Sequence, residues 1–254
     1  MSDWFHCGRT LNQIKLKMFC FPYAGGTASV FSKWADLLPS TVQLISVELP
    51  GRGPRLKEPP YLKMSSLVDD LAGEIRPLLD KPFVFFGHSM GAIIAFELAR
   101  LLRLRRGREP KALFASGRRA PQIPNNEPVT YDLPTGEFIE ELSKLDGTPR
   151  EVLEHKELME MMIPLLRADF QLIQTYNFAH DAPLRYPVTA YGGIQDQYIT
   201  RDMILPWREQ TSSRFALHML PGDHFFIRSS QTQLLRILAH ELREIIACPS
   251  LNNA

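Results

Sequence analysis

A short glycine-flanked segment of the chain has the residues expected of a nucleophilic serine. Gly87-His-Ser-Met-Gly91 matches the G-x-S-x-G pattern, in which the serine sits on a sharp strand-to-helix turn between small residues. The apolar run 83–86 precedes it and a helical stretch, 92–102, follows it, as that turn requires. An incidental glycine-rich turn would satisfy the spacing but not this context. The pattern therefore predicts that Ser89 is a nucleophile.

A serine hydroxyl needs a base that takes its proton, and the chain has seven histidines that could do so. His224 stands in Pro221-Gly-Asp-His224, between an expected strand, 214–220, and an expected final helix, 231–246. Where a serine occupies such a turn, the acid and then the histidine follow it along the chain. We therefore expect His224 to be the base, and His88 to pack beside the turn.

The acid that orients the histidine should follow a late strand and precede His224. Asp196 meets both conditions, because it comes shortly after the expected strand 188–191. It would hold one imidazole tautomer and stabilise the imidazolium without taking the proton. Asp202 and Asp223 are alternatives, but Asp223 adjoins His224 and Asp202 suits a solvated position. Asp196 is the predicted acid.

Two backbone N–H groups should stabilise the negative charge that develops on the reacting carbonyl oxygen. The residue after the serine, Met90, would supply one. The glycine-rich loop Pro22-Tyr-Ala-Gly-Gly26, after the first core strand, would supply the other from Tyr23 or Ala24. A plain tight turn is the alternative for this loop.

The elements that must position these residues alternate between strands and helices. This alternation predicts a mostly parallel sheet with helices on both faces, in an α/β protein of the α/β-hydrolase fold. Residues 1–14 show no pattern and are expected to be a loose leader. The expected strands are 17–22, 42–47, 83–86, 111–115, 188–191 and 214–220, and the expected helices are 30–38, 65–79, 92–102 and 231–246.

The segment 121–187 interrupts this alternation with helical patterns and no good strand. We interpret it as a helical lid inserted into a core made of 15–120 and 188–248; the alternative is that its helices belong to the regular alternation. Methionine and other apolar side chains of the lid suit an adaptable acyl channel, although most of them should pack within the lid. The expected substrate-binding residues are Tyr23, Met162, Leu166, Phe170 and Phe225.

Composition excludes several other classes. The 254 residues suit one domain of the larger α/β type, and a formal net charge of +1 gives no electrostatic reason to bind nucleic acid or an anionic membrane. No signal peptide and no apolar run of about 20 residues is present. The three cysteines, Cys7, Cys20 and Cys248, form no metal or disulfide pattern. The segment Gly51-Arg-Gly53 lacks the third glycine of a nicotinamide-binding turn. We expect a cytoplasmic protein without a cofactor.

Taken together, five segments resemble the type II (external, editing) thioesterases of nonribosomal peptide and polyketide biosynthesis. The resemblance extends from Phe19 to about Ile246. The segments are Phe21-Pro-Tyr-Ala-Gly-Gly26, Leu49-Pro-Gly-Arg-Gly53, Phe86-Gly-His-Ser-Met-Gly91, Pro164-Leu-Leu-Arg-Ala-Asp-Phe170 and Gly222-Asp-His-Phe225. At Tyr23 many members of that family have histidine, a difference that should change pocket shape more than chemistry.

The resemblance implies an enzyme that hydrolyses acyl thioesters from the phosphopantetheine arm of acyl or peptidyl carrier proteins, and so clears misprimed or stalled units. It implies the triad Ser89, Asp196 and His224, with the backbone amides of Ala24 and Met90 as the oxyanion hole. Carrier-protein domains are the expected partners of an enzyme expected to be monomeric. The alternatives are a thioesterase that releases medium-chain fatty acids, a small-molecule carboxylesterase and, from another class, a non-catalytic binding module on the same fold.

Overall fold

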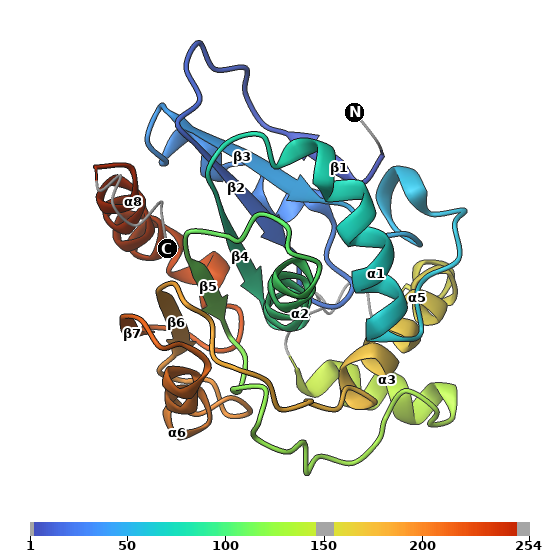
Figure 1. The fold of residues 1–254 in the computed structure, drawn as a ribbon. Coiled ribbons are helices and arrows are strands. Elements are labelled where there is room, and N and C mark those ends of the chain that lie inside the picture. Colours follow the sequence, from blue (N-terminus) through green and yellow to red (C-terminus); the bar gives the residue numbers. More distant parts are fainter. Residues whose placement is uncertain (1–2, 146–154, 248–254) are drawn as a thin grey trace.

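A seven-stranded sheet runs through the centre of the computed structural model, which describes residues 3–145 and 155–247 (Figure 1). Its strand order is β1-β3-β2-β4-β5-β6-β7. All neighbouring strands are parallel except β1 and β3, so the predicted mostly parallel sheet is confirmed. The strands are β1 (Phe5–Cys7), β2 (Leu16–Phe21), β3 (Val42–Val47), β4 (Phe83–His88), β5 (Leu113–Ser116), β6 (Val188–Gly193) and β7 (Phe215–Leu220).

Helices cover both faces of this sheet, which is why its central strands are continuous apolar runs. Every residue of β2, β4, β5 and β6 is buried. On one face, α1 (Met64–Ile75) and α2 (Met90–Leu104) enclose a core that includes Leu71 and Phe85. On the other face, α8 (Gln231–Ala247) closes a second core around Phe86 and Leu238 (Figure 1).

Two expectations about the first part of the chain are wrong. The leader contains β1, which pairs with β3 through Phe5 opposite Val47. The expected helix 30–38 consists instead of two 3₁₀ turns, Ala28–Phe31 and Trp34–Asp36. The apolar spacing was helical because Phe31 and Trp34 both face the second core, and short 3₁₀ turns achieve this as well.

The segment 121–187 lies between β5 and β6 and contributes two long helices, α3 (Thr135–Lys144) and α5 (Lys156–Gln174). Its described residues include no strand of the central sheet. The two helices lie together (Figure 1), and the rings of Phe138 and Phe170 are 5.6 Å apart. Two short helices, α6 (Arg201–Ile204) and α7 (Phe226–Ser229), follow β6 and β7. The division into core and lid stays a prediction.

No helix within residues 3–145 and 155–247 has both the length and the apolar character needed to cross a membrane. Cys248 lies outside these residues. Cys20 is buried in β2, where burial raises the pKa of its thiol well above the usual value.

Candidate active site

Ser89 occupies the turn between β4 and α2 in a backbone conformation that few residues other than glycine adopt, with φ 53° and ψ −113°. The flanking glycines make this turn possible. A Cβ at Gly87 would lie 2.1 Å from the carbonyl oxygen of Gly91, and a Cβ at Gly91 would lie 2.1 Å from that of Phe21. The tight approach of three backbone segments therefore explains the G-x-S-x-G spacing.

Ser89, His224 and Asp196 form one hydrogen-bonded chain across the carboxyl ends of the strands. The Ser89 Oγ lies 3.1 Å from His224 Nε2, and His224 Nδ1 lies 2.7 Å from Asp196 Oδ2. The other carboxylate oxygen, Oδ1, accepts hydrogen bonds from the backbone N–H groups of Tyr198 and Ile199, both at 2.9 Å. Because Asp196 accepts a hydrogen bond from Nδ1–H, this tautomer leaves Nε2 as the acceptor for the serine hydroxyl.

The alternative acids lie elsewhere. Asp223 accepts a hydrogen bond from the backbone N–H of Phe225, and Asp202 is exposed in α6. The structure therefore brings Asp196 to His224 and not these two carboxylates. Its side chain has no exposed surface, whereas that of His224 is 17% exposed.

His88 is more than a packing residue beside the turn. It is fully buried, and its Nε2 donates to the backbone carbonyl of His224 at 3.0 Å. Its Nδ1 accepts from the hydroxyl of Ser116 at 2.9 Å. Burial, reinforced by the neighbouring His224, holds the pKa of His88 well below its usual value, so the ring is neutral. It ties the loop that carries His224 to β4 and β5, a role that its position in the sequence does not reveal.

The glycine-rich loop after β2 is held by a buried ion pair. Arg52 makes two hydrogen bonds to the Asp169 carboxylate, at 2.9 and 2.8 Å, and donates to the carbonyl of Gly26 at 3.2 Å. The same carboxylate accepts the backbone N–H of Gly25 at 2.8 Å. Both charged residues belong to segments that carry the family resemblance, but the sequence analysis assigned neither of them a role.

The two expected oxyanion-hole amides are unoccupied by other parts of the described chain. Neither the Ala24 N–H nor the Met90 N–H donates a hydrogen bond to a described residue. Ala24 lines the same cavity as Ser89, and Met90 begins α2 directly after the serine. The N–H groups at the start of a helix have no partner within the helix and favour negative charge nearby.

A cavity of about 140 Å³ opens beside Ser89 and His224. Four of the five expected substrate-binding residues line it: Tyr23, Leu166, Phe170 and Phe225. The fifth, Met162, packs instead against the small core between α3 and α5. The Tyr23 hydroxyl is hydrogen-bonded to Arg228.

The cavity wall also contains three charged residues that the sequence analysis did not single out. These are Arg118, Arg119 and Glu127. The available signal was the pair of adjacent arginines, which begins three residues after the expected strand 111–115.

Comparison with known proteins places this chain in a family. The model of the thioesterase domain matches residues 16–242. The gramicidin S biosynthesis protein GrsT of Aneurinibacillus migulanus is 42% identical, covering 97% of this chain and 96% of its own. The medium-chain S-acyl fatty acid synthase thioesterase of Rattus norvegicus is 36% identical over 83% of this chain and 81% of its own. The type II thioesterase BorB from the borrelidin biosynthetic cluster superposes with a TM-score of 0.86 at 32% identity, covering 94% of this chain and 97% of its own.

These similarities extend over almost the whole chain and confirm the resemblance inferred from the five segments. They also confirm the α/β-hydrolase fold and the assignment as a thioester hydrolase. The protein belongs to the thioesterase family, among the type II thioesterases associated with nonribosomal peptide and polyketide biosynthesis.

Proposed function

We propose that this enzyme hydrolyses acyl thioesters carried on the phosphopantetheine arm of acyl or peptidyl carrier proteins, and so clears misprimed or stalled units. The observation that carries the proposal is the chain of hydrogen bonds from Ser89 through His224 to Asp196, at the edge of a cavity. The similarity to the gramicidin S biosynthesis protein GrsT and to BorB from the borrelidin biosynthetic cluster supports this kind of pathway.

In the first half of the proposed reaction, the Ser89 Oγ attacks the thioester carbonyl carbon while His224 Nε2 takes the hydroxyl proton. A tetrahedral intermediate forms and collapses, the carbon–sulfur bond breaks, and the pantetheine thiol leaves with the proton held by His224. Asp196 stabilises the imidazolium throughout, because its carboxylate is fixed by the amides of Tyr198 and Ile199.

In the second half, water attacks the acyl-serine ester and again gives its proton to His224. The ester bond to Ser89 breaks, the serine oxygen recovers that proton, and the free carboxylic acid departs. In both halves the amides of Ala24 and Met90 would donate to the oxyanion. Donors held in place before the reaction are worth about 10²–10³ in rate each.

The proposed role of Asp169 and Arg52 is to position one of these donors. The Asp169 carboxylate holds the N–H of Gly25, and the N–H of the preceding residue, Ala24, donates to no described residue. The helix that bears Asp169, α5, also contributes Leu166 and Phe170 to the cavity. This arrangement would connect the position of α5 to the completeness of the oxyanion hole.

Release of medium-chain fatty acids is the second candidate, favoured by the similarity to the rat enzyme. The two activities share the chemistry and differ in the carrier and the acyl group. A panel of acyl-loaded carrier proteins that differ in chain length and branching separates them, with nitrophenyl esters as the test of a general carboxylesterase. Higher kcat/KM for the free esters than for every carrier-linked substrate would contradict the proposal.

The decisive variant is Ser89→Ala, with Ser66→Ala, an exposed serine of α1, as the matched control. We expect kcat for carrier-linked thioesters to fall by about 10³-fold or more in Ser89→Ala, because the nucleophile is lost, and to be unchanged in the control. A fluorophosphonate probe should label the wild type and the control but not Ser89→Ala. Retention of most activity without labelling at Ser89 would show that the nucleophile is another residue.

The proposal includes a monomer that acts in the cytoplasm on carrier-protein domains. Size-exclusion chromatography with light scattering tests the monomer, and fractionation of the producing cells tests the location. A dimer that persists at nanomolar concentration, or recovery in a membrane fraction, would contradict these two parts and leave the chemistry untouched.

A further inference from the structure

Arg118 is a charged residue that lines the cavity beside Ser89 and also a neighbouring cavity of about 330 Å³ that contains Tyr176. It lies two residues beyond β5, whose last residue, Ser116, accepts a hydrogen bond from the Ser89 N–H at 2.7 Å. The backbone carbonyl of Arg118 accepts from the indole N–H of Trp207 at 2.9 Å. The backbone of this arginine is therefore fixed close to the nucleophile.

The guanidinium of Arg118 is buried, and no carboxylate among the described residues forms an ion pair with it. The residue is 7% exposed, and it makes no hydrogen bond or ion pair through its side chain with any described residue. Its Nε is buried without a partner. Burial, together with the adjacent Arg119, lowers the pKa of Arg118 to about 10, so the group remains charged at neutral pH.

The acidic groups nearest to Arg118 are engaged elsewhere. Glu127 accepts a hydrogen bond from Arg119 at 2.8 Å. The three residues Arg118, Arg119 and Glu127 together therefore carry one excess positive charge. The hydroxyl of Tyr176 donates to Glu97 at 2.5 Å on the other side.

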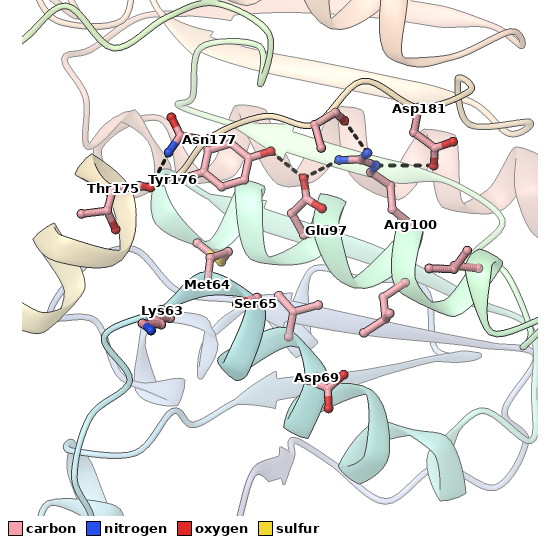
Figure 2. Close-up of a pocket in the computed structure, with 14 residues that line it drawn as sticks. Lys63, Met64, Ser65, Asp69, Glu97, Arg100, Thr175, Tyr176, Asn177 and Asp181 are labelled. Carbon is pink, nitrogen blue, oxygen red and sulfur yellow. Dashed lines mark hydrogen bonds and ion pairs between the residues drawn. The ribbon is translucent and has the colours of Figure 1, made fainter.

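That other side is a separate groove between α1, α2 and the residues after α5 (Figure 2). Figure 2 shows Tyr176, Glu97, Arg100 and Asp181 in one continuous chain of interactions. In that groove Glu97, Arg100 and Asp181 are paired with one another, and its other charged residues, Lys63 and Asp69, are exposed to solvent. Among the described residues, the groove therefore holds no buried charge comparable to Arg118.

A cation removed from water is costly unless an anion or several hydrogen-bond acceptors compensate it. A carboxylate compensates a guanidinium particularly well, because its two oxygens match two parallel N–H donors. The cavity that would receive the acyl group is therefore apolar along Leu166 and Phe170 and cationic at Arg118. An entirely alkyl acyl chain would leave this cation unpaired.

We infer that the acyl pocket selects acyl groups that carry a carboxylate, and that Arg118 binds this carboxylate. The inference rests on the proposed function, since it names the class of acyl group for the same site. It makes Arg118 a specificity-determining residue that touches the distal end of the acyl chain and takes no part in proton transfer.

The test uses pantetheine-like N-acetylcysteamine thioesters of three acyl groups with the same shape: glutaryl, its terminal amide, and the branched alkyl analogue in which a methyl-bearing carbon replaces the carboxylate. Succinyl and adipyl sets vary the reach. Wild type should prefer the carboxylate over the alkyl analogue by about 10- to 100-fold in kcat/KM in the best-fitting set, with the amide between them. Ser89→Ala measures the background hydrolysis of each thioester.

Three variants separate recognition from folding. Arg118→Met should abolish the preference while retaining turnover of the alkyl thioester, and Arg118→Lys should retain part of it. Arg185→Met removes an exposed arginine outside the cavity wall and should keep the full preference. As a readout independent of turnover, free glutarate should raise the thermal midpoint of wild type and Arg185→Met but not of Arg118→Met.

Equal kcat/KM for the carboxylate and alkyl thioesters in every set would overturn the inference, as would a preference that survives in Arg118→Met. Equal values for carboxylate and amide would overturn the requirement for a charge. Failure to hydrolyse any thioester would contradict the proposed function instead, and the effect of glutarate on the thermal midpoint would then decide the inference alone.

Discussion

Two buried arginines near the nucleophile differ in what surrounds the guanidinium. Arg52 has both terminal nitrogens on the Asp169 carboxylate and a further bond to the Gly26 carbonyl. Arg118 has no such partner among the described residues, although it is nearly as buried, with 7% exposure against 3%. The Nε of each is without a partner, so the difference lies in the terminal nitrogens.

Because of this difference, Arg52 has a structural role, whereas Arg118 is available to bind a ligand. The Arg52–Asp169 pair joins the loop after β3, the loop after β2 and α5, and its charges are satisfied within the protein. Arg118 lies on a cavity wall, and its guanidinium forms no ion pair or hydrogen bond with a described residue. The burial of an arginine therefore indicates its role only when its hydrogen-bond acceptors are also known.

Removing one partner of the Arg52–Asp169 ion pair should have the largest effect on stability. Arg52→Met leaves the buried Asp169 carboxylate without its cation, and we expect the free energy of unfolding to fall by about 3–5 kcal/mol. Urea denaturation followed by circular dichroism measures this loss. The double variant Arg52→Met/Asp169→Leu should recover much of it, because no charge is then left buried alone. A loss below about 1 kcal/mol in the single variant would contradict the structural role.

His88 is a third buried basic side chain, and it avoids an unpaired charge by staying neutral. Its pKa in the folded protein is lowered from about 6.5 by burial and by His224, with Arg228 acting in the same direction. Below about pH 6.5 the unfolded state therefore binds more protons. The free energy of unfolding should fall with decreasing pH, by up to about 1.4 kcal/mol per pH unit from this group.

Above pH 6.5 the contribution of His88 is fully present and constant. His88→Gln should remove its part of the acid slope, measured by urea denaturation between pH 5 and 8. The difference between wild type and variant isolates this histidine from the other six. An unchanged slope would mean that His88 is not the group that resists protonation.

Replacing Arg118 should have the smallest effect on stability. Arg118→Met removes a desolvated charge that has no described partner, so we expect the free energy of unfolding to rise or to change by less than about 1 kcal/mol. The same urea experiment tests this, with Arg52→Met as the contrast. A loss of about 3 kcal/mol or more would show that Arg118 has a structural partner after all.

Patterns that follow from burial could be predicted from the sequence. The strands β3 and β4 were expected within two residues of their observed ends, because parallel strands covered on both faces must be apolar throughout. β1 was missed because it is short, lies at the edge, and depends on a partner, β3, that is distant along the chain. Short edge strands have no alternation long enough to detect.

Some residues of the candidate site could likewise be predicted from the sequence, and others could not. Ser89, Asp196 and His224 could be selected because the turn glycines and the order along the chain restrict the choice. Met162 could not be placed, because the hydrophobic spacing of α5 does not say which apolar face meets α3 and which meets the cavity.

The sheet, the serine turn and the order of nucleophile, acid and base along the chain could be inferred from the sequence, because they depend on local periodicity and on the space that glycine leaves. The three-dimensional arrangement was needed to show that His88 supports His224, that Asp169 and Arg52 hold the loop of Ala24, and that no described side chain pairs with Arg118. Whether a buried polar group is satisfied depends on residues far away along the chain, and folding alone brings those residues together.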